Sequence, residues 1–346
     1  MEQENAPKIV DVARVAGVST ATVSRALSKP ETVAKSTREA VLAAAAQTGY
    51  RINVAARNLR RRRTGAVVVL VPNLGNPFFS QILAGIEATL SKKGLSILMV
   101  DTMQSGTRPD FIQEYLHHTR ADGVIVLDGS LPSDLLQSSR QSSNRVPLAF
   151  GCEWHPDEDY PSVRADNEQG ARLAIEHLVE LGHEKIGYIN GPHANVLSKH
   201  RLAATKAALA AAEKPINEEW FFEGDFTMQA GVRAARRWLD MKERPTGLFC
   251  ANDETAIGLI SELHQCGINV PDQLSIVGFD DVDIAQHYIP TLTTIWQPRL
   301  ELGKRVAQML VEGINQGGLN PSDPTQILPV KLRVRNSTAP PGSAGR

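Results

Sequence analysis

The chain contains only three cysteines in 346 residues, Cys152, Cys250 and Cys266. They lie far apart and form no Cys-x-x-Cys pair, which argues against both a disulfide framework and a zinc site. We therefore expect neither a metal nor a cofactor, and a reducing cytoplasm is the simplest location for the protein.

Long apolar runs are absent as well. No stretch approaches the roughly 20 apolar residues that span a bilayer, and residues 1–7, which we expect to be flexible, contain no apolar signal core. These absences predict a soluble protein that has no membrane partner.

The familiar catalytic motifs are also missing. The sequence has no Gly-x-Ser-x-Gly elbow, no P-loop, no His-Glu-x-x-His and no convincing Gly-x-Gly-x-x-Gly after a strand. His117 and His118 lie in a polar, helix-like region, which favours a solvated face over a metal pair. An enzyme is the main alternative from another functional class, and these absences disfavour it.

Charge is distributed unevenly along the chain. The whole sequence has a formal charge of -1, but residues 1–63 contain twelve Lys and Arg against five Asp and Glu. This segment therefore has a net charge of +7, and the remainder has -8. A basic head suggests a polyanionic partner, which an acidic body would repel.

The basic head has the pattern of three short helices over residues 8–52. Apolar residues recur at helical spacing from position 9 to 16, and Gly17 then breaks the helix. Ser19 is a good N-cap for a second helix with Val23, Ala26 and Leu27 on its buried face. Ser36 and Glu39 predict a capping box for a third helix, which ends at Gly49. The spacing is that of a helix-turn-helix unit.

The second helix presents side chains suited to DNA. Arg25 is the only long cationic side chain on its outward face, where an arginine can donate two hydrogen bonds to guanine. Short hydroxyl side chains and the helix N-terminus suit phosphates and base edges. Any small helical bundle shows similar caps and stripes, so spacing alone leaves DNA binding open. The candidate DNA contacts in the head are Ser19, Thr20, Ala21, Thr22, Ser24 and Arg25.

These residues carry a family resemblance. The runs Val10-Asp11-Val12-Ala13, GVSTATVSRAL from Gly17 to Leu27, and Gly49-Tyr50 resemble the N-terminal signature of the lac-repressor family, and the similarity continues over nearly the whole chain. The resemblance implies a repressor that binds a palindromic double-stranded operator as a homodimer. Its two heads would occupy successive major grooves.

Residues 53–63 read as a hinge helix followed by a basic linker. A helix of under two turns is marginal alone in water. In the resembled family this segment orders on operator DNA, where a leucine wedges into the minor groove. The resemblance implies DNA contacts from Asn53, Arg57 and Leu59. Ile52 stands where the family often has proline, which weakens preorganisation of the helix start. An ordinary basic linker is the alternative.

From Thr64 to position 336 the chain alternates short apolar runs with helical patterns. We predict strands at 66–71, 95–100, 123–127, 186–189, 247–250 and 275–279, and helices near 79–92, 167–181, 198–212, 228–239 and 254–267. The fold class is α/β, in which an all-α helix-turn-helix head precedes a periplasmic-binding-protein-like body of two doubly wound subdomains. Residues 337–346, rich in Gly, Pro and small residues, are predicted to be disordered.

Polar and aromatic residues gather at the ends of the predicted strands, where such sheets bind ligands. They match lac-repressor-type and ribose-binding cores, and their amide, carboxylate and guanidinium groups suit adjacent hydroxyls. The candidate effector contacts are Asn76, Phe78, Phe79, Arg201, Phe226, Asn252, Asp280 and Gln297. Asp253 and Asp281 are expected to cap helices instead.

The nature of the effector is only partly constrained. Asn195 and Leu197 occupy positions where a purine-binding family member has arginine and threonine, which disfavours a hypoxanthine-type ligand. A sugar, a sugar phosphate or a nucleoside remains open. A secreted sugar-binding protein would share the body, but it would need a signal peptide and would have no use for a basic head.

A dimer rather than a tetramer is expected. The chain after Val334 reads RNSTAPPGSAGR, which has no leucine heptads and contains two adjacent prolines. Dimerisation would then use the body. The candidate interface residues lie on two helices and are Ile82, Leu83, Ile86, Ile257, Ile260 and Leu263. These stripes could equally be core.

Overall fold

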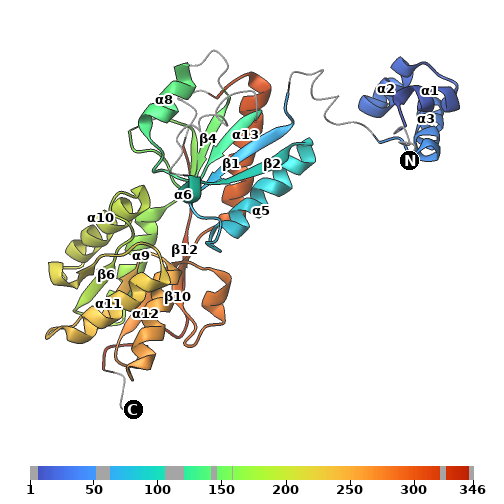
Figure 1. The fold of residues 1–346 in the computed structure, drawn as a ribbon. Coiled ribbons are helices and arrows are strands. Elements are labelled where there is room, and N and C mark those ends of the chain that lie inside the picture. The colour runs from blue at the N-terminus through green and yellow to red at the C-terminus, as the bar shows by residue number, and fades with distance from the viewer. Residues whose placement is uncertain are drawn as a thin grey trace. The chain divides into compact units, whose positions relative to one another are not determined.

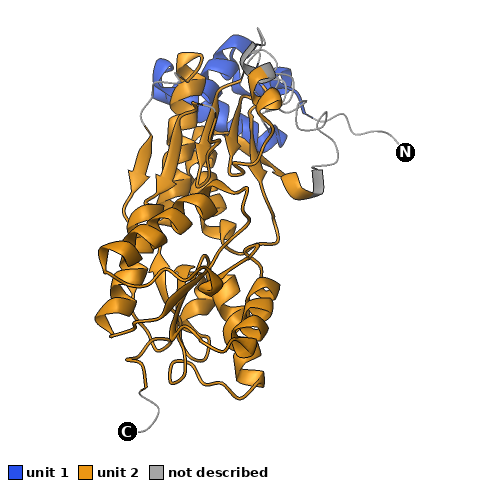
Figure 2. Ribbon diagram, turned by 90° about the vertical axis from the view of Figure 1, so that its left-hand side faces the viewer, with its two compact units in different colours: residues 1–63 blue, residues 64–346 orange. Residues whose placement is uncertain are grey.

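A computed structural model (Figure 1) describes residues 7–51, 63–105, 121–141, 146–157, 159–319 and 325–342. The chain divides into two compact units, residues 1–63 and 64–346 (Figure 2). We call their described parts the head and the body. The predicted hinge contacts Asn53, Arg57 and Leu59 and the pair His117 and His118 lie outside the described residues.

The head is a three-helix unit built on a small core. Its helices are α1 (Ile9–Ala16), α2 (Thr20–Ser28) and α3 (Lys35–Thr48), with a 3₁₀ turn η1 (Pro30–Thr32) before α3. Each helix places two buried residues, one helical turn or less apart, in the shared core. These residues are Val12, Ala13, Val23, Ala26, Val41 and Ala44.

Most predicted helix ends in the head are confirmed. Gly17 and Gly49 follow α1 and α3 with φ of 65° and 67°, the left-handed conformation that glycine adopts without strain. Ser19 Oγ accepts the N–H of Thr22 at 3.1 Å. The predicted capping box of Ser36 and Glu39 is wrong, because α3 begins one residue earlier, at Lys35, with no side-chain cap. Ser36 is therefore already inside the first turn.

The body contains two six-stranded sheets. The first lobe has the strand order β11-β5-β4-β3-β1-β2, and its neighbouring strands pair in parallel. The strands are β1 (Ala66–Val71), β2 (Ser96–Asp101), β3 (Gly123–Val126), β4 (Leu148–Gly151), β5 (Ser162–Ala165) and β11 (Gln326–Leu328). Helices α5 (Phe79–Leu90) and α13 (Arg299–Gln316) cover one face, and α8 (Ser133–Gln141) packs on the other. The short helix α6 (Thr102–Ser105) follows β2.

The second lobe repeats this plan with the order β12-β10-β9-β8-β6-β7. Its strands are β6 (Ile186–Ile189), β7 (Phe221–Phe222), β8 (Gly247–Cys250), β9 (Ser275–Asp280), β10 (Thr293–Trp296) and the antiparallel β12 (Lys331–Arg333). Helices α9 (Asn167–Glu180) and α10 (Val196–Ala211) cover one face, while α11 (Met228–Asp240) and α12 (Asp253–Gln265) cover the other (Figure 1). The two-subdomain fold class is thus confirmed.

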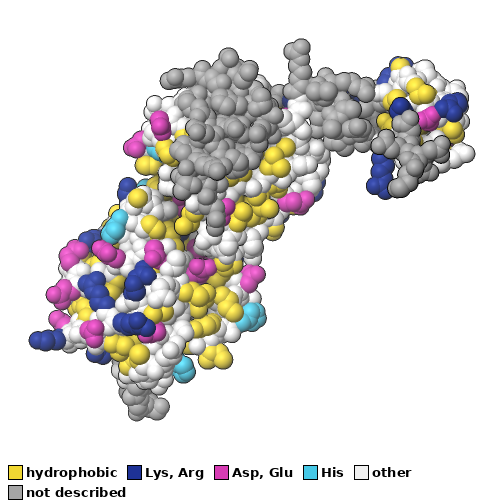
Figure 3. All heavy atoms as spheres, in the orientation of Figure 1, with side chains coloured by type: hydrophobic (Ala, Val, Ile, Leu, Met, Phe, Trp, Pro, Cys, Tyr) yellow, Lys and Arg dark blue, Asp and Glu magenta, His cyan; other side chains and the backbone are white. Residues whose placement is uncertain are grey.

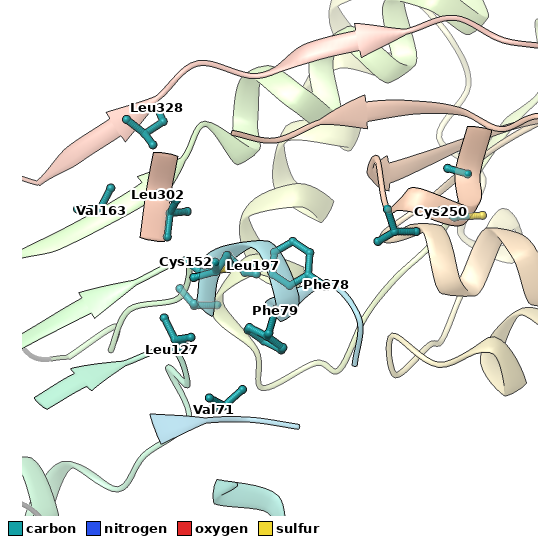
Figure 4. Close-up of a cluster of buried hydrophobic side chains, with 14 of the residues drawn as sticks. Val71, Phe78, Phe79, Leu127, Cys152, Val163, Leu197, Cys250, Leu302 and Leu328 are labelled. Carbon is teal, nitrogen blue, oxygen red and sulfur yellow. The ribbon is translucent and has the colours of Figure 1, made fainter. Parts of the chain in front are cut away.

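The chain passes between the lobes three times, after β5, after β10 and after β11. One buried apolar cluster continues from the first lobe into the second and includes Phe78, Leu197 and Cys250 (Figure 4). The carboxyl ends of the strands from both lobes lie around this junction, which positions the polar residues considered below.

Of the two alternatives for the apolar stripes on α5 and α12, dimer interface and core, the structure supports the core. Ile82 and Ile86 are fully buried in their own chain, where α5 packs so closely on α13 that a Cβ on Gly303 would lie 2.0 Å from the Ile82 carbonyl oxygen. The face of α12 packs on α11 in the same way. Of the candidate interface residues only Leu83 is half-buried rather than buried, so these stripes are core.

The prediction that the chain is disordered from Ser337 onward is wrong for residues 337–339. Ser337 is fully buried, and its Oγ accepts the N–H of Thr293 at 2.8 Å and donates to the Ile276 carbonyl at 2.6 Å. The N–H of Ala339 donates to Ser275 Oγ at 2.9 Å. Composition rich in small residues disfavours a helix, but it permits an extended segment that bonds along β9.

Within the described residues, no helix combines the length and apolar character needed to cross a membrane.

Candidate functional site

The outward face of α2 is the candidate surface in the head. Thr20, Ala21 and Arg25 are exposed, while Thr22 and Ser24 are half-buried beside the core. The Oγ atoms of Ser19 and Thr22 lie 2.9 Å apart, so Ser19 orders the first turn of α2. Lys and Arg side chains are visible on the surface of the head (Figure 3). Such a face can approach a polyanion without displacing any core residue.

In the body, unusual backbone conformations gather at strand ends. Cys152, Phe226, Asp280 and Asp281 have φ of 67°, 65°, 118° and 52°. Cys152 follows β4, Phe226 lies after β7, and Asp280 ends β9. A non-glycine residue in this left-handed backbone conformation costs about 1–3 kcal/mol of conformational free energy, and such residues concentrate at ligand sites. Among the described residues only Glu213, after α10, shares this feature elsewhere, so the strain marks one place in the fold.

Arg201 is the cation at the centre of this candidate site. It lies on α10 with 2% of its surface exposed. Its Nε donates to Asn167 Oδ1 at 2.8 Å, its Nη1 donates to the Ala251 carbonyl, and its Cζ lies 3.6 Å from the centroid of the Phe279 ring. These contacts fix the guanidinium plane, which suits it to orienting a bound group.

Asp280 and Gln297 are brought together at the ends of β9 and β10. Gln297 Nε2 donates to Asp280 Oδ1 at 2.7 Å, and both side chains are buried. Burial raises the pKa of Asp280 to about 7, although the guanidinium groups of Arg201 and Arg299 oppose the shift. The carboxyl group is therefore suited to bonding with hydroxyl groups near neutral pH.

Asn252 is engaged at both ends of its amide. Its Oδ1 accepts the N–H of Thr255 at 3.1 Å, which caps α12, and its Nδ2 donates to the Phe226 carbonyl at 2.8 Å. It therefore holds Phe226, whose ring is half-buried, in its strained conformation.

The expectation that Asp253 and Asp281 cap helices is wrong. Asp253 is fully buried and accepts from the Val282 N–H at 2.9 Å and from the Thr294 hydroxyl, which ties α12 to β10. Asp281 pairs with Arg335 at 2.7 Å. Asn252 takes the capping position because it precedes the first helical residue.

The first lobe contributes aromatic residues. Phe78 and Phe79 are buried, and their ring centroids lie 5.1 Å apart in an edge-to-face arrangement. Figure 4 shows both rings near Leu197 and Cys152. Asn76 Oδ1 accepts the Phe78 N–H at 2.8 Å, so Asn76 shapes the turn before α5. Arg299 Nη1 donates to the Phe78 carbonyl at 3.3 Å and Nη2 to the Asp281 carbonyl at 2.9 Å, which links the two lobes.

Sequence reasoning did not identify Glu153 and Ser198. Glu153 follows Cys152, is 6% exposed, and accepts hydrogen bonds from Gly129 and Asn195, each at 2.9 Å. Ser198 is fully buried in the first turn of α10. An acidic residue three positions after the apolar run 147–150 could have signalled Glu153. Nothing in the sequence distinguishes Ser198.

Comparisons with known proteins agree with this architecture. Bacterial regulatory proteins of the lacI family match residues 8–53, and a periplasmic binding protein-like domain matches residues 175–338. The HTH-type transcriptional repressor CytR of Escherichia coli (strain K12) is 35% identical over 337 residues, which cover 97% of this chain and 98% of that protein. The motifs VSTATVSRAL, NPFFSQILAGIE and TLTTIWQPR also point to the cytidine repressor among family members.

Two solved structures resemble the chain over nearly its full length. The lac repressor dimer bound to operator and the anti-inducer ONPF is 30% identical, with a TM-score of 0.81 over 97% of this chain and all of that one. A complex of the transcriptional regulator CelR with cellobiose is 31% identical, with a TM-score of 0.72 over 96% of this chain and 99% of that one.

Proposed function

This chain belongs to the lacI family of bacterial regulatory proteins, and we propose that it binds a palindromic operator as a homodimer under the control of a small hydroxylated effector. As a family member it is a DNA-binding transcriptional repressor with an effector-binding domain, and it is not an enzyme. The operator geometry, the dimer and the effector class are the finer parts of the proposal.

The exposed face of α2 supports operator recognition by the head. Arg25 would donate to a guanine in the major groove, and Ser19, Thr20, Ala21, Thr22 and Ser24 would contact phosphates and base edges. Asn53, Arg57 and Leu59 would act in the minor groove between two heads. The related lac repressor was solved as a dimer on its operator, which supports the same arrangement. We assign residues 8–52 to DNA binding, 53–63 to the hinge and 64–336 to effector binding.

One observation carries the effector assignment. Residues with strained backbone conformations, Asp280 among them, lie at strand ends near the buried Arg201. These groups can bond to adjacent hydroxyls, and Phe78, Phe79 and Phe226 supply apolar faces beside them. Asn76 and Asn252 hold the aromatic residues, and Gln297 orients Asp280. The relative in complex with cellobiose supports a hydroxylated ligand.

Coupling between the sites would pass through the relative position of the lobes. A ligand that contacts both lobes favours one arrangement, and linkage then requires operator binding to change ligand affinity by the same factor. The hydrogen bonds from Arg299 to the carbonyls of Phe78 and Asp281 lie at the junction between the two lobes.

Selection from random duplexes with the full chain tests the DNA part. We expect a palindromic sequence whose binding weakens steeply with salt, because basic residues displace counterions. Loss of all sequence preference would contradict the proposal. Light scattering at micromolar concentration should give a two-chain mass, and a stable four-chain mass would contradict the dimer.

A further inference from the structure

We propose that Glu153 and Ser198 form a second polar end of the effector site, which binds an uncharged hydrogen-bonding group and excludes phosphorylated ligands. This inference rests on the effector site proposed above and narrows the class of ligand that the site takes.

Glu153 joins the two lobes at the site. Its Oε2 accepts the Gly129 N–H of the first lobe, and its Oε1 accepts Asn195 Nδ2 from the N-terminus of α10 in the second lobe, both at 2.9 Å. Each oxygen has capacity for one more hydrogen bond. A ligand that donates to this carboxyl group would therefore contact a side chain that already bridges the lobes.

The carboxyl group of Glu153 has little contact with solvent. It is 6% exposed, and burial raises its pKa to about 7 against the opposing effect of its bonds to Gly129 and Asn195. Asp128, also buried, lies close enough to raise that pKa further. This end of the site is therefore short of positive charge, and a phosphate here would meet two acidic side chains.

Ser198 provides the second observation. Its hydroxyl is fully buried, and its Oγ has no hydrogen-bond partner among the described residues. A Cβ on Gly191 would lie 2.5 Å from this Oγ and 2.3 Å from the Phe226 ring, so the hydroxyl lies beside Phe226 at the end of β6. Ser198 is also three residues before Arg201 on α10, which places both on one face of the helix. A buried hydroxyl without a partner is uncommon and indicates an unmet bonding requirement.

The two buried arginines of the described chain offset these acids only in part, because the charge of Arg201 lowers the pKa of Glu153 by less than the charge of Asp128 raises it. Arg201 is bonded to Asn167 and the Ala251 carbonyl and is stacked on Phe279. Arg299 donates from Nη1 and Nη2 to the carbonyls of Phe78 and Asp281, and its buried Nε has no hydrogen-bond partner among the described residues. A phosphate at the Glu153 end would therefore meet more negative than positive charge, whereas a hydroxyl or amide group would need only Glu153 and Ser198.

Matched ligand pairs test the inference on the full-length protein. The pairs are ribose with ribose 5-phosphate, glucose with glucose 6-phosphate, and cytidine and adenosine with their 5′-monophosphates. Thermal shift and calorimetry should show binding of at least one uncharged member and at least tenfold weaker binding of its phosphate. A phosphate that binds as tightly as its uncharged partner would overturn the inference, as would a failure of every uncharged member to bind.

Variants separate this role from a merely structural one. Ser198→Ala removes only the unpartnered hydroxyl, so it should keep the melting temperature of the free protein and weaken the uncharged ligand at least fivefold. Glu153→Gln should reduce the discrimination against phosphate at least threefold, and Glu87→Gln, an exposed residue on α5, should leave it unchanged. Unchanged ligand binding by a folded Ser198→Ala variant would remove Ser198 from the site.

Operator binding is measured on the same preparations. Tight operator binding together with preference for a phosphate defeats only this inference, whereas loss of specific DNA binding defeats the proposed function.

Discussion

The head and the body hold their candidate functional side chains in opposite environments. In the head, Arg25 and Thr20 are exposed on a helix whose core is made by other residues. In the body, Arg201, Asp280 and Glu153 are buried and bonded to neighbouring elements. Substitutions in the head should therefore change DNA binding without changing stability, whereas substitutions in the body should couple ligand binding to folding.

The largest effect is expected from Asp280→Ala. The change removes both acceptor oxygens from the ligand and leaves Gln297 without its partner. Lost hydrogen bonds to a charged group cost about 1.5–3 kcal/mol each, so the effector response should fall roughly 100-fold or more. Fluorescence anisotropy of labelled operator, titrated with effector, measures this response. Operator affinity without effector should stay at the parental value, and a parental effector response would place the ligand elsewhere.

Glu153→Gln should change the pH dependence of stability. The pKa of Glu153 is about 7 in the folded chain and near 4.5 when it is unperturbed. Between these values the folded state holds a proton that the unfolded state has lost, so stability decreases as pH rises through this window and is constant above it. The variant lacks this contribution, which amounts to roughly 3 kcal/mol at most.

Urea unfolding at pH 5 and pH 8 measures the difference. The free energy of unfolding should decline less in Glu153→Gln than in the parent, although Asp280 still contributes a decline of the same sign. The exposed variant Glu87→Gln should behave like the parent. Equal declines in all three proteins would show that the Glu153 carboxyl group is not buried in its acidic form.

Arg25→Ala should weaken binding to the cognate operator by about 1–3 kcal/mol and relax the preference at one base position, since a two-bond contact to a base is lost. The melting temperature should not change, because Arg25 is exposed. Binding-site selection with the variant measures the preference. Uniform weakening over all sequences would make Arg25 a phosphate contact instead.

The smallest expected effect on the protein itself is that of Leu59→Ala. If Leu59 wedges into the operator, the variant should bend DNA less while its stability and effector affinity stay at parental values. A gel-based bending assay on the selected operator measures the angle. The same angle in variant and parent would refute the wedge.

The two lobes also differ in how far the sequence predicts their site. In the second lobe, the strands β8 and β9 are continuous apolar runs, so the sequence alone places Asn252 and Asp280 at their ends. In the first lobe, β4 is only four residues long and ends in glycine. Ala149 and Gly151 have low strand propensity, so this run does not stand out as a strand, and sequence reasoning misses Glu153 after it.

Other features depend on tertiary contacts that local patterns do not contain. The unpartnered state of Ser198 depends on the approach of Gly191 and Phe226 from other elements. The order of residues 337–339 depends on bonds to β9 and β10 rather than on their own propensity. Helix α13 is different, because Leu302, Val306 and Leu310 recur at helical spacing. That pattern is present in the sequence, although the helix was not among those we predicted.

The most direct test of the account is the operator affinity of the full chain at fixed salt, measured with and without a saturating effector found in the matched-pair screen. If the buried site of the body controls the exposed surface of the head, the effector should change operator affinity by at least about fivefold, the lower end of typical coupling between sites. The effector's own affinity should change by the same factor when operator is present. Equal operator affinity in both conditions, with the effector bound, would contradict the account.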